Sequence, residues 1–147
     1  MADFRATNED FQQVVRANFL RQGLMQHLGA TLEDVQPGYV RIQMPYRHSL
    51  TQQHGYFHAG AITSIVDSAC GYAALTLMPP DTDVLTIEYK VNFMAPARGT
   101  MAIAHGRVLR PGRTITVCQG EVITLNDDHE QVCATMLATI IGRPIKS

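Results

Sequence analysis

The spacing of apolar positions changes along the chain, and each spacing predicts a different element. Between residues 7 and 22 apolar side chains recur every three or four positions, which predicts an amphipathic helix. Thr7 is placed to cap its start, and Gly23 is placed to end it. The buried stripe of this helix would be formed by Phe11, Val14, Val15 and Phe19.

Alternation of apolar and polar residues predicts strands on both sides of a long apolar run. Residues 30–35 and 40–44 fit two strands that are joined by a turn at 36–38. The chain after residue 81 fits four more strands, which we expect to follow one another as a meander. Their ranges are 85–93, 100–109, 114–125 and 131–141.

The stretch between the two groups of strands, from Ala61 to about Leu77, predicts a helix that is apolar almost all round. Its one acid is Asp67, and a carboxylate there costs free energy unless it is paired or used. It is therefore either a hydrogen-bonded buried acid or a catalytic group facing a gap. The small and polar positions share one stripe, formed by Gly60, Thr63, Ser64, Asp67, Gly71 and Ala74.

A long antiparallel sheet needs a cover on one face, and only the apolar helix is long enough to supply it. The expected fold class is therefore α+β. A long central helix would be wrapped by a curved antiparallel sheet of about five to six strands, with an extra N-terminal helix. At 147 residues the chain predicts a single domain, residues 1–147, without internal repeats.

Composition narrows the class of function. The chain is 46% hydrophobic and 17% charged, with net charge −1, so it is typical of a globular protein with no nucleic acid or membrane partner. No apolar run reaches bilayer length and the N-terminus lacks signal-peptide features, which favours a cytoplasmic protein. Cys70, Cys118 and Cys133 are an odd and scattered set, which we expect to be buried free thiols.

Two further places beside the helix could carry chemistry. The residues around Gly60 start the helix, where free N–H groups and small side chains could form an oxyanion hole. Gln52 precedes them and could face a carbonyl or a water molecule. His54 and His58 have a metal-ligand spacing, but no other ligand motif accompanies them, so we expect no metal. The absence of a nucleophile elbow, a P-loop and a dinucleotide motif argues against serine hydrolases, NTPases and dinucleotide-dependent enzymes.

The segment before and inside the central helix resembles a known family. His58-Ala59-Gly60 followed by Asp67 resembles the HGG…D motif of hotdog-fold acyl-CoA thioesterases of the PaaI and 4-hydroxybenzoyl-CoA thioesterase type. Residues 92–97 (NFMAPA) are similar to the strand end and proline turn of that family. Residues 108–113 (VLRPGR) are similar to its hairpin with basic residues. The likeness covers nearly the whole chain. The three segments in this order are more specific to the family than the first motif alone.

The resemblance implies a hotdog-fold thioesterase that hydrolyses an acyl-CoA to free acid and CoA without a metal or an organic cofactor. Asp67 would be the general base or the nucleophile, and a backbone N–H of Ala59 or Gly60 would polarise the thioester carbonyl. Gln52 would place the water or the carbonyl, and Thr86 would add a hydroxyl group. Ala59 stands where the family has glycine, so the N–H remains while a methyl group narrows the site.

The resemblance also implies how substrate and subunits meet. Substrate contacts would come from His58 and Ser64, and Arg110 and Arg113 would hold the phosphates of CoA. The protein would form a homodimer with active sites at the interface, and such dimers would pair into a homotetramer.

Two alternative functions stay open at this point. A hydratase or dehydratase of the same fold, acting on enoyl thioesters, would need His54 or His58 facing the acid. A non-catalytic acyl-CoA-binding sensor would bind without turnover, although the chain shows no DNA-binding extension and no basic region. The seven methionines favour a deformable apolar pocket, which both aromatic and medium-chain acyl groups would fit.

Overall fold

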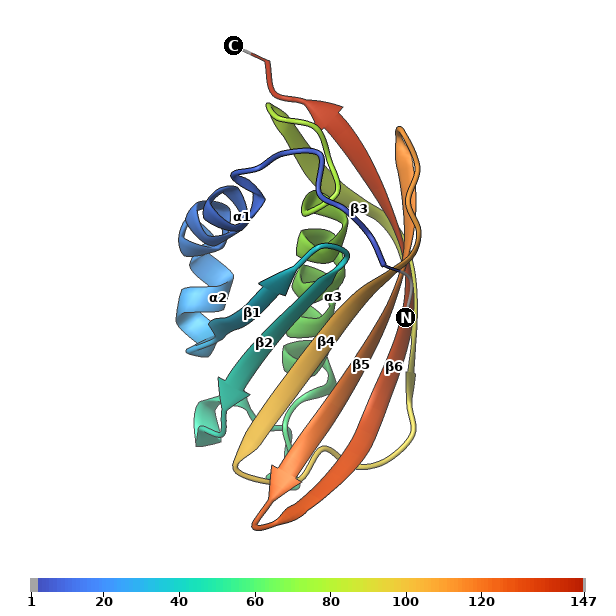
Figure 1. The fold of residues 1–147 in the computed structure, drawn as a ribbon. Helices are drawn as coiled ribbons and strands as arrows, with labels where there is room; N and C mark the ends of the chain where they lie inside the picture. Colours follow the sequence, from blue (N-terminus) through green and yellow to red (C-terminus); the bar gives the residue numbers. More distant parts are fainter. Residues whose placement is uncertain (1–2, 147) are drawn as a thin grey trace.

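The computed structural model describes residues 3–146, which form a curved six-stranded sheet around a long helix (Figure 1). The helices are α1 (Phe11–Leu20), α2 (Gly23–Leu28) and α3 (Ala59–Leu75), with a 3-10 turn at His48–Leu50. The strands are β1 (Thr31–Gln36), β2 (Tyr39–Pro45), β3 (Thr82–Phe93), β4 (Met101–Arg110), β5 (Ile115–Asn126) and β6 (His129–Pro144). The predicted α+β architecture is confirmed, including the wrapped central helix and an additional N-terminal helix.

The order of strands in the sheet is β1-β2-β4-β5-β6-β3, and every pair is antiparallel. The predicted four-strand meander is correct for β4 to β6 but wrong for β3, which pairs with β6, Leu85 lying opposite Ile141. The place beside β4 is taken by β2, which pairs with it from Tyr39 to Pro45. Strand β3 is therefore an edge strand, with β6 as its one neighbour within residues 3–146.

Helix α3 lies directly on the sheet because two glycines leave room for it. A Cβ atom at Gly106 of β4 would collide with the backbone of Ala69 and Cys70. A Cβ atom at Gly120 of β5 would collide with the side chain of Val66. These close approaches hold the middle of α3, and with it Asp67, at one position along the sheet.

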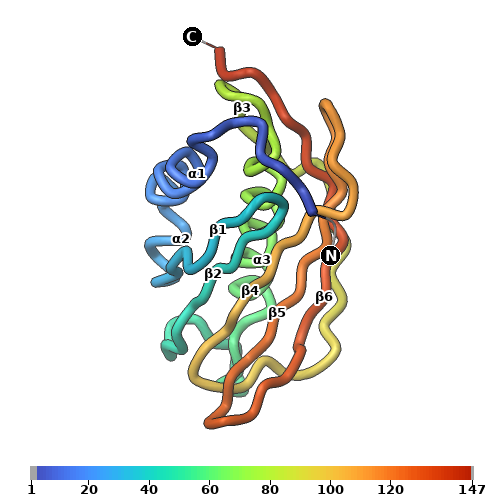
Figure 2. The backbone as a smooth tube through the Cα atoms, in the orientation of Figure 1, coloured from blue at the N-terminus to red at the C-terminus, as the bar shows by residue number. Residues whose placement is uncertain are grey.

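The N-terminal segment differs from the prediction at both ends of its helix. Helix α1 starts at Phe11, and Thr7 is no cap because its hydroxyl donates to the carbonyl of Met78, 3.2 Å away, just after α3. Gly23 begins α2 rather than ending α1, and Gly29, with φ 67°, ends α2. Figure 2 shows that the chain runs through α1 and α2 beside α3 before it enters β1.

Strand β3 contains a β-bulge that reverses the facing of its side chains. The register with β6 shifts between Thr86 and Glu88. Val84 packs on the core before the bulge and Val91 packs on it afterwards, an even-numbered and then an odd-numbered position. The predicted strand over residues 85–93 is confirmed, but its alternating apolar residues do not all lie on one face, because a bulge adds one residue to one strand. As a result Thr86 faces α3.

Candidate active site

Asp67 lies in the middle of the half-exposed stripe of α3, and the bulge of β3 brings Thr86 opposite it. Thr86 Oγ1 donates a hydrogen bond to Asp67 Oδ1 at 2.7 Å. Both side chains are half-buried. Two residues that the resemblance expects to act together are thus in contact within one chain.

The surroundings of Asp67 make its carboxylate a stronger base than usual. Burial raises the pKa of Asp67, and the hydrogen bond from Thr86 opposes part of that rise. Within residues 3–146 the second carboxylate oxygen, Oδ2, has no hydrogen-bond donor. A carboxylate with a raised pKa and one free oxygen can accept a proton from a bound water molecule or attack a carbonyl carbon.

The start of α3 offers a backbone donor at Ala59. His58 occupies the N-cap position, and its Nδ1 accepts a hydrogen bond from the N–H of Gly60 at 2.7 Å. The N–H of Gly60 is therefore already used. The N–H of the exposed Ala59 has no acceptor among the described residues, and it points from the positive end of the helix dipole. Of the two expected oxyanion donors, Ala59 is the one that is free.

Gln52 lies with Ala59 on the wall of a hollow of ≈460 Å³. Its side-chain carbonyl Oε1 accepts hydrogen bonds from the N–H groups of His54 at 2.5 Å and Tyr56 at 3.3 Å. This tight turn fixes the side chain, and its amide nitrogen has no acceptor within residues 3–146. Gln52 can therefore donate to a substrate carbonyl or to a water molecule beside Ala59.

Ala59 and Asp67 of one chain lie too far apart to act on the same carbonyl group. Ala59 and Asp67 are eight residues apart on α3, about 12 Å along the helix axis. An oxyanion donor lies about 3 Å from the carbonyl oxygen, and an attacking atom lies about 3–3.5 Å from the carbonyl carbon. A single thioester carbonyl cannot meet both requirements in one chain. The structure thus forms two half-sites, Gln52 with Ala59 and Asp67 with Thr86.

The remaining predicted site residues divide into near and distant groups. Ser64 lines a hollow of ≈540 Å³ with Asp67, and its hydroxyl donates to the carbonyl of Gly60 at 2.7 Å. Arg110 and Arg113 belong to the β4–β5 hairpin, at the end of the molecule opposite the start of α3 (Figure 1). Within one chain the structure does not bring these arginines together with either half-site.

An arginine and a tyrosine that were not predicted from the sequence lie beside the half-site formed by Gln52 and Ala59. Tyr56 lines the hollow of Gln52 and Ala59. Arg98 stacks on it, with its guanidinium carbon 4.6 Å from the ring centroid, and its Nη2 donates to Tyr56 Oη at 2.6 Å. Arg98 follows the proline turn after β3, and no local pattern links it to Tyr56. It adds a positive charge at the end where α3 starts.

The three cysteines are buried in the core. Cys70, Cys118 and Cys133 are free and buried, as the sequence predicts. Burial raises the pKa of Cys118 to about 12 and that of Cys133 to about 11.

Within residues 3–146 no group of three or more His, Cys, Asp or Glu side chains could hold a metal ion. In the same range, no helix is long and apolar enough to cross a membrane. Neither His54 nor His58 contacts Asp67 within the chain.

Comparison with known proteins identifies the family. A family model described as the thioesterase superfamily matches residues 54–131. A thioesterase family protein from Silicibacter pomeroyi is 45% identical, with a TM-score of 0.90 over 91% of this chain and 98% of that chain. A protein of Halobacterium salinarum, whose name places it provisionally among esterases, is 32% identical over 124 residues, 81% of this chain and 82% of that protein.

The PaaI protein of E. coli is 18% identical with a TM-score of 0.81, over 93% of this chain and 97% of that chain, and this likeness shows the fold alone. The matched residues 54–131 make up more than half of the chain and include His58, Asp67 and Thr86. The family model, the relatives and the wrapped-helix fold agree, and the chain belongs to the thioesterase superfamily, with the hotdog fold.

Proposed function

We propose that the protein hydrolyses acyl-CoA thioesters to free acid and CoA, at two active sites that are each shared between the protomers of a homodimer. The contact between Asp67 and Thr86 carries this proposal, because it leaves a carboxylate of raised pKa with one free oxygen. The thioesterase superfamily supports the class of reaction.

In the first step Asp67 takes a proton from a water molecule, whose oxygen attacks the thioester carbon. The N–H of Ala59 from the other chain stabilises the oxyanion that forms, and Gln52 holds the carbonyl or the water. The C–S bond then breaks, and CoA leaves as a thiolate that takes the proton from Asp67. In a second route Asp67 attacks the carbon directly, the C–S bond breaks and CoA leaves as a thiolate. Water then hydrolyses the resulting anhydride and supplies the proton that the thiolate takes. A single turnover in heavy-oxygen water separates the routes, because only the anhydride route can leave the label in Asp67.

The edge strand β3 supports a shared site. One side of its twelve residues has no neighbour among the described strands, and its Tyr89 and Phe93 are 45% and 48% exposed. Pairing of β3 with its symmetry copy would extend the sheet and lay the two α3 helices antiparallel. A two-fold axis near Thr63, midway between Ala59 and Asp67, would place each Ala59 opposite the aspartate of the other chain. The small side chains of the stripe would let the helices approach closely. We extend the proposal to a homotetramer of two such dimers.

In such a dimer, arginine side chains from both chains would lie near the phosphates of one bound CoA. Arg98 lies at the start of α3 in its own chain. Because the helices would be antiparallel, the β4–β5 hairpin of the other chain would lie at that same end, with Arg110 and Arg113. Joint replacement of these two arginines by alanine is expected to raise KM for acyl-CoA while kcat stays near its wild-type value.

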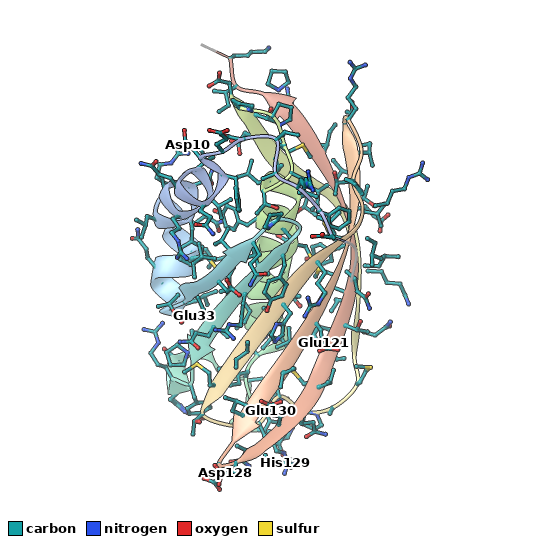
Figure 3. The ribbon with its side chains drawn as sticks, in the orientation of Figure 1. Asp10, Glu33, Glu121, Asp128, His129 and Glu130 are labelled. Carbon is teal, nitrogen blue, oxygen red and sulfur yellow. The ribbon has the colours of Figure 1, made fainter. Side chains whose placement is uncertain are left out.

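The first experiment measures release of free CoA from short, medium, long and aromatic acyl-CoAs, with wild type and Asp67→Ala side by side. We expect turnover of at least one class and a loss of about 10²–10⁴-fold in the variant. Glu33→Gln is the control, since this acid lies on β1, away from α3 (Figure 3). The three native thiols need a blank in the assay. If no thioester is hydrolysed, the catalytic role of Asp67 is wrong and non-catalytic acyl-CoA binding becomes the better interpretation.

A second experiment tests whether the site is shared. Asp67→Ala and Ala59→Pro are each expected to be inactive, because each damages both sites of its own dimer. Unfolded together and refolded in equal amounts, they would form mixed dimers in which one site has both groups intact. Half of the dimers would be mixed, so about a quarter of the wild-type activity should return. Activity that stays at the level of the separate variants would place the whole site within one chain.

A further inference from the structure

A hollow of ≈820 Å³ opens at the turn between β1 and β2, and it is larger than the two hollows described above. Tyr39 and Arg107 form part of its wall and are neighbours across β2 and β4. Each of them precedes a valine that is buried in the core, Val40 or Val108. Because successive side chains of a strand point to opposite faces, Tyr39 and Arg107 point away from α3. None of the lining residues belongs to either half-site.

Part of the wall is apolar and comes from the N-terminal segment, the β1–β2 turn and the end of β4. Phe4 packs directly on Gly38 of the turn, where a Cβ atom would collide with the phenylalanine ring. Pro37 and Leu109 also line the hollow, and Leu109 is 51% exposed. A ligand with an apolar surface would remove water from these side chains, which favours binding.

A second part of the wall is a guanidinium group that lies on an aromatic ring. The guanidinium carbon of Arg107 lies 4.4 Å from the ring centroid of Tyr39. Tyr39 Oη and His105 Nδ1 are 2.8 Å apart, and this hydrogen bond fixes the tyrosine ring. A guanidinium group is planar, and planar rings such as nucleic-acid bases stack on it. Arg107 therefore offers a stacking surface inside the hollow.

The third part of the wall, on β1, carries an ordered row of hydrogen-bonding atoms. Asp34 and Gln36 are two positions apart on the strand, so their side chains share a face. Gln36 Nε2 donates to Asp34 Oδ2 at 2.8 Å. Within residues 3–146 the second N–H of Gln36 Nε2 has no acceptor and Asp34 Oδ1 has no donor. The pair thus presents one donor followed by two acceptors.

The edge of a guanine ring carries the complementary order of groups. Its acceptor O6 is followed by two donors, the N1–H group and the N2 amino group. Gln36 can donate to O6 while Asp34 accepts from N1 and N2. Adenine has one donor beside one acceptor, and hypoxanthine lacks the N2 amino group, so each of these bases can make two of the three hydrogen bonds.

We infer that this hollow is a binding site for a guanine nucleoside, with the base stacked on Arg107 and its edge bound by Asp34 and Gln36. The carboxylates of Asp3 and Asp34 and the one guanidinium group give the lining residues a net negative charge. A phosphate group on the ligand is therefore disfavoured, and the base carries the recognition. The inference is independent of the proposed hydrolysis, because the hollow lies on the other face of the sheet.

The first test compares guanosine, inosine and adenosine, three nucleosides that differ in the edge of the base and carry no phosphate group. Titration calorimetry on the full chain gives their Kd values. We expect guanosine to bind about tenfold more tightly than either of the others, because it makes one more hydrogen bond to a charged carboxylate. Equal Kd values for the three nucleosides, or no binding of guanosine, would overturn the inference.

Variants of the wall assign the preference to its residues. Asp34→Asn replaces one of the two acceptors by a donor, so it should abolish the preference for guanosine while adenosine still binds. Arg107→Ala removes the stacking surface and should weaken all three nucleosides. Glu33→Gln, at an acid of the same strand that does not line the hollow, is the matched control and should keep the preference. A preference that survives in Asp34→Asn would place the base elsewhere.

A last pair of ligands separates recognition of the base from recognition of phosphate. GMP should bind no more tightly than guanosine, and CoA, which carries an adenine nucleotide, should not displace guanosine. Binding of GMP without binding of guanosine would show that phosphate is the recognised group. Displacement of guanosine by CoA would assign the hollow to the nucleotide of CoA, and either result overturns the inference. A thermal unfolding curve confirms that each variant is folded.

Discussion

The start and the middle of α3 each carry a candidate catalytic group, and the two groups are held in place in different ways. At the start, the free N–H of Ala59 is set by a local cap, in which His58 bonds to Gly60 two residues later. In the middle, the carboxylate of Asp67 is set by Thr86, nineteen residues away on a bulged edge strand. The first arrangement needs only a short stretch of chain, whereas the second needs the finished sheet.

This difference determines which kind of substitution damages each region. The donor at the start belongs to the backbone, so the side chain at Ala59 can change as long as the N–H remains. The acid in the middle is a side chain whose pKa depends on burial and on Thr86, so changes in its neighbours alter its chemistry.

At the start of α3, a large effect is expected from Ala59→Pro, which removes the N–H and nothing else of chemical importance. Proline is favoured at the first position of a helix, and the extended conformation of His58, with ψ 138°, suits a following proline. We expect kcat to fall about 10²–10³-fold with an unchanged melting temperature. Ala59→Gly keeps the N–H and should stay near wild type. Equal activity of the two variants would show that another group polarises the carbonyl.

In the middle of α3, Thr86→Val is expected to lower kcat/KM about tenfold at neutral pH, because a hydrogen bond to a charged group is lost. The bond from Thr86 lowers the pKa of Asp67, so its removal should raise that pKa further. A base must be unprotonated to act, so the acidic limb of the pH–rate profile should move to higher pH. Thr86→Ser keeps the hydroxyl group and should leave the limb in place. A limb that does not move in Thr86→Val would exclude Asp67 as the titrating base.

The same contrast explains what could be predicted from the sequence. The start of the central helix was predicted at Ala61, two residues after its observed start at Ala59, and the stripe of α3 followed from helical spacing alone. The cap that His58 forms was not predicted. The partner of Asp67 was expected only by resemblance, since no local rule places Thr86 opposite it. The bulge at β3 and its pairing with β6 depend on the whole sheet. The hydrogen bond from Tyr72 Oη to Asn18 Oδ1 likewise joins residues that are 54 positions apart, so no local pattern predicts it.

A third prediction concerns the cost of keeping Asp67 charged. Its folded pKa is raised by burial, so this acid contributes most to stability below its unfolded pKa, and that contribution is lost as pH rises through the folded pKa. Asp67→Asn should therefore raise the melting temperature at pH about 7, and the gain should shrink toward pH about 4, near the ordinary pKa of aspartic acid. Calorimetry across this range tests the sign. A gain that grows on acidification would mean that Asp67 is stabilised in its charged form.

The smallest effect is expected at Gly71, which lies one helical turn after Asp67 on α3. Its missing side chain faces open space, so Gly71→Ala should gain helix propensity and raise the free energy of unfolding by about 0.5–1 kcal/mol. Gly106 is the matched glycine, where a Cβ would collide with the backbone of Ala69 and Cys70, and Gly106→Ala should lower stability. Urea unfolding of both variants measures the opposite signs. A loss of stability in Gly71→Ala would show that the space above Gly71 is closed, contrary to the open space found there.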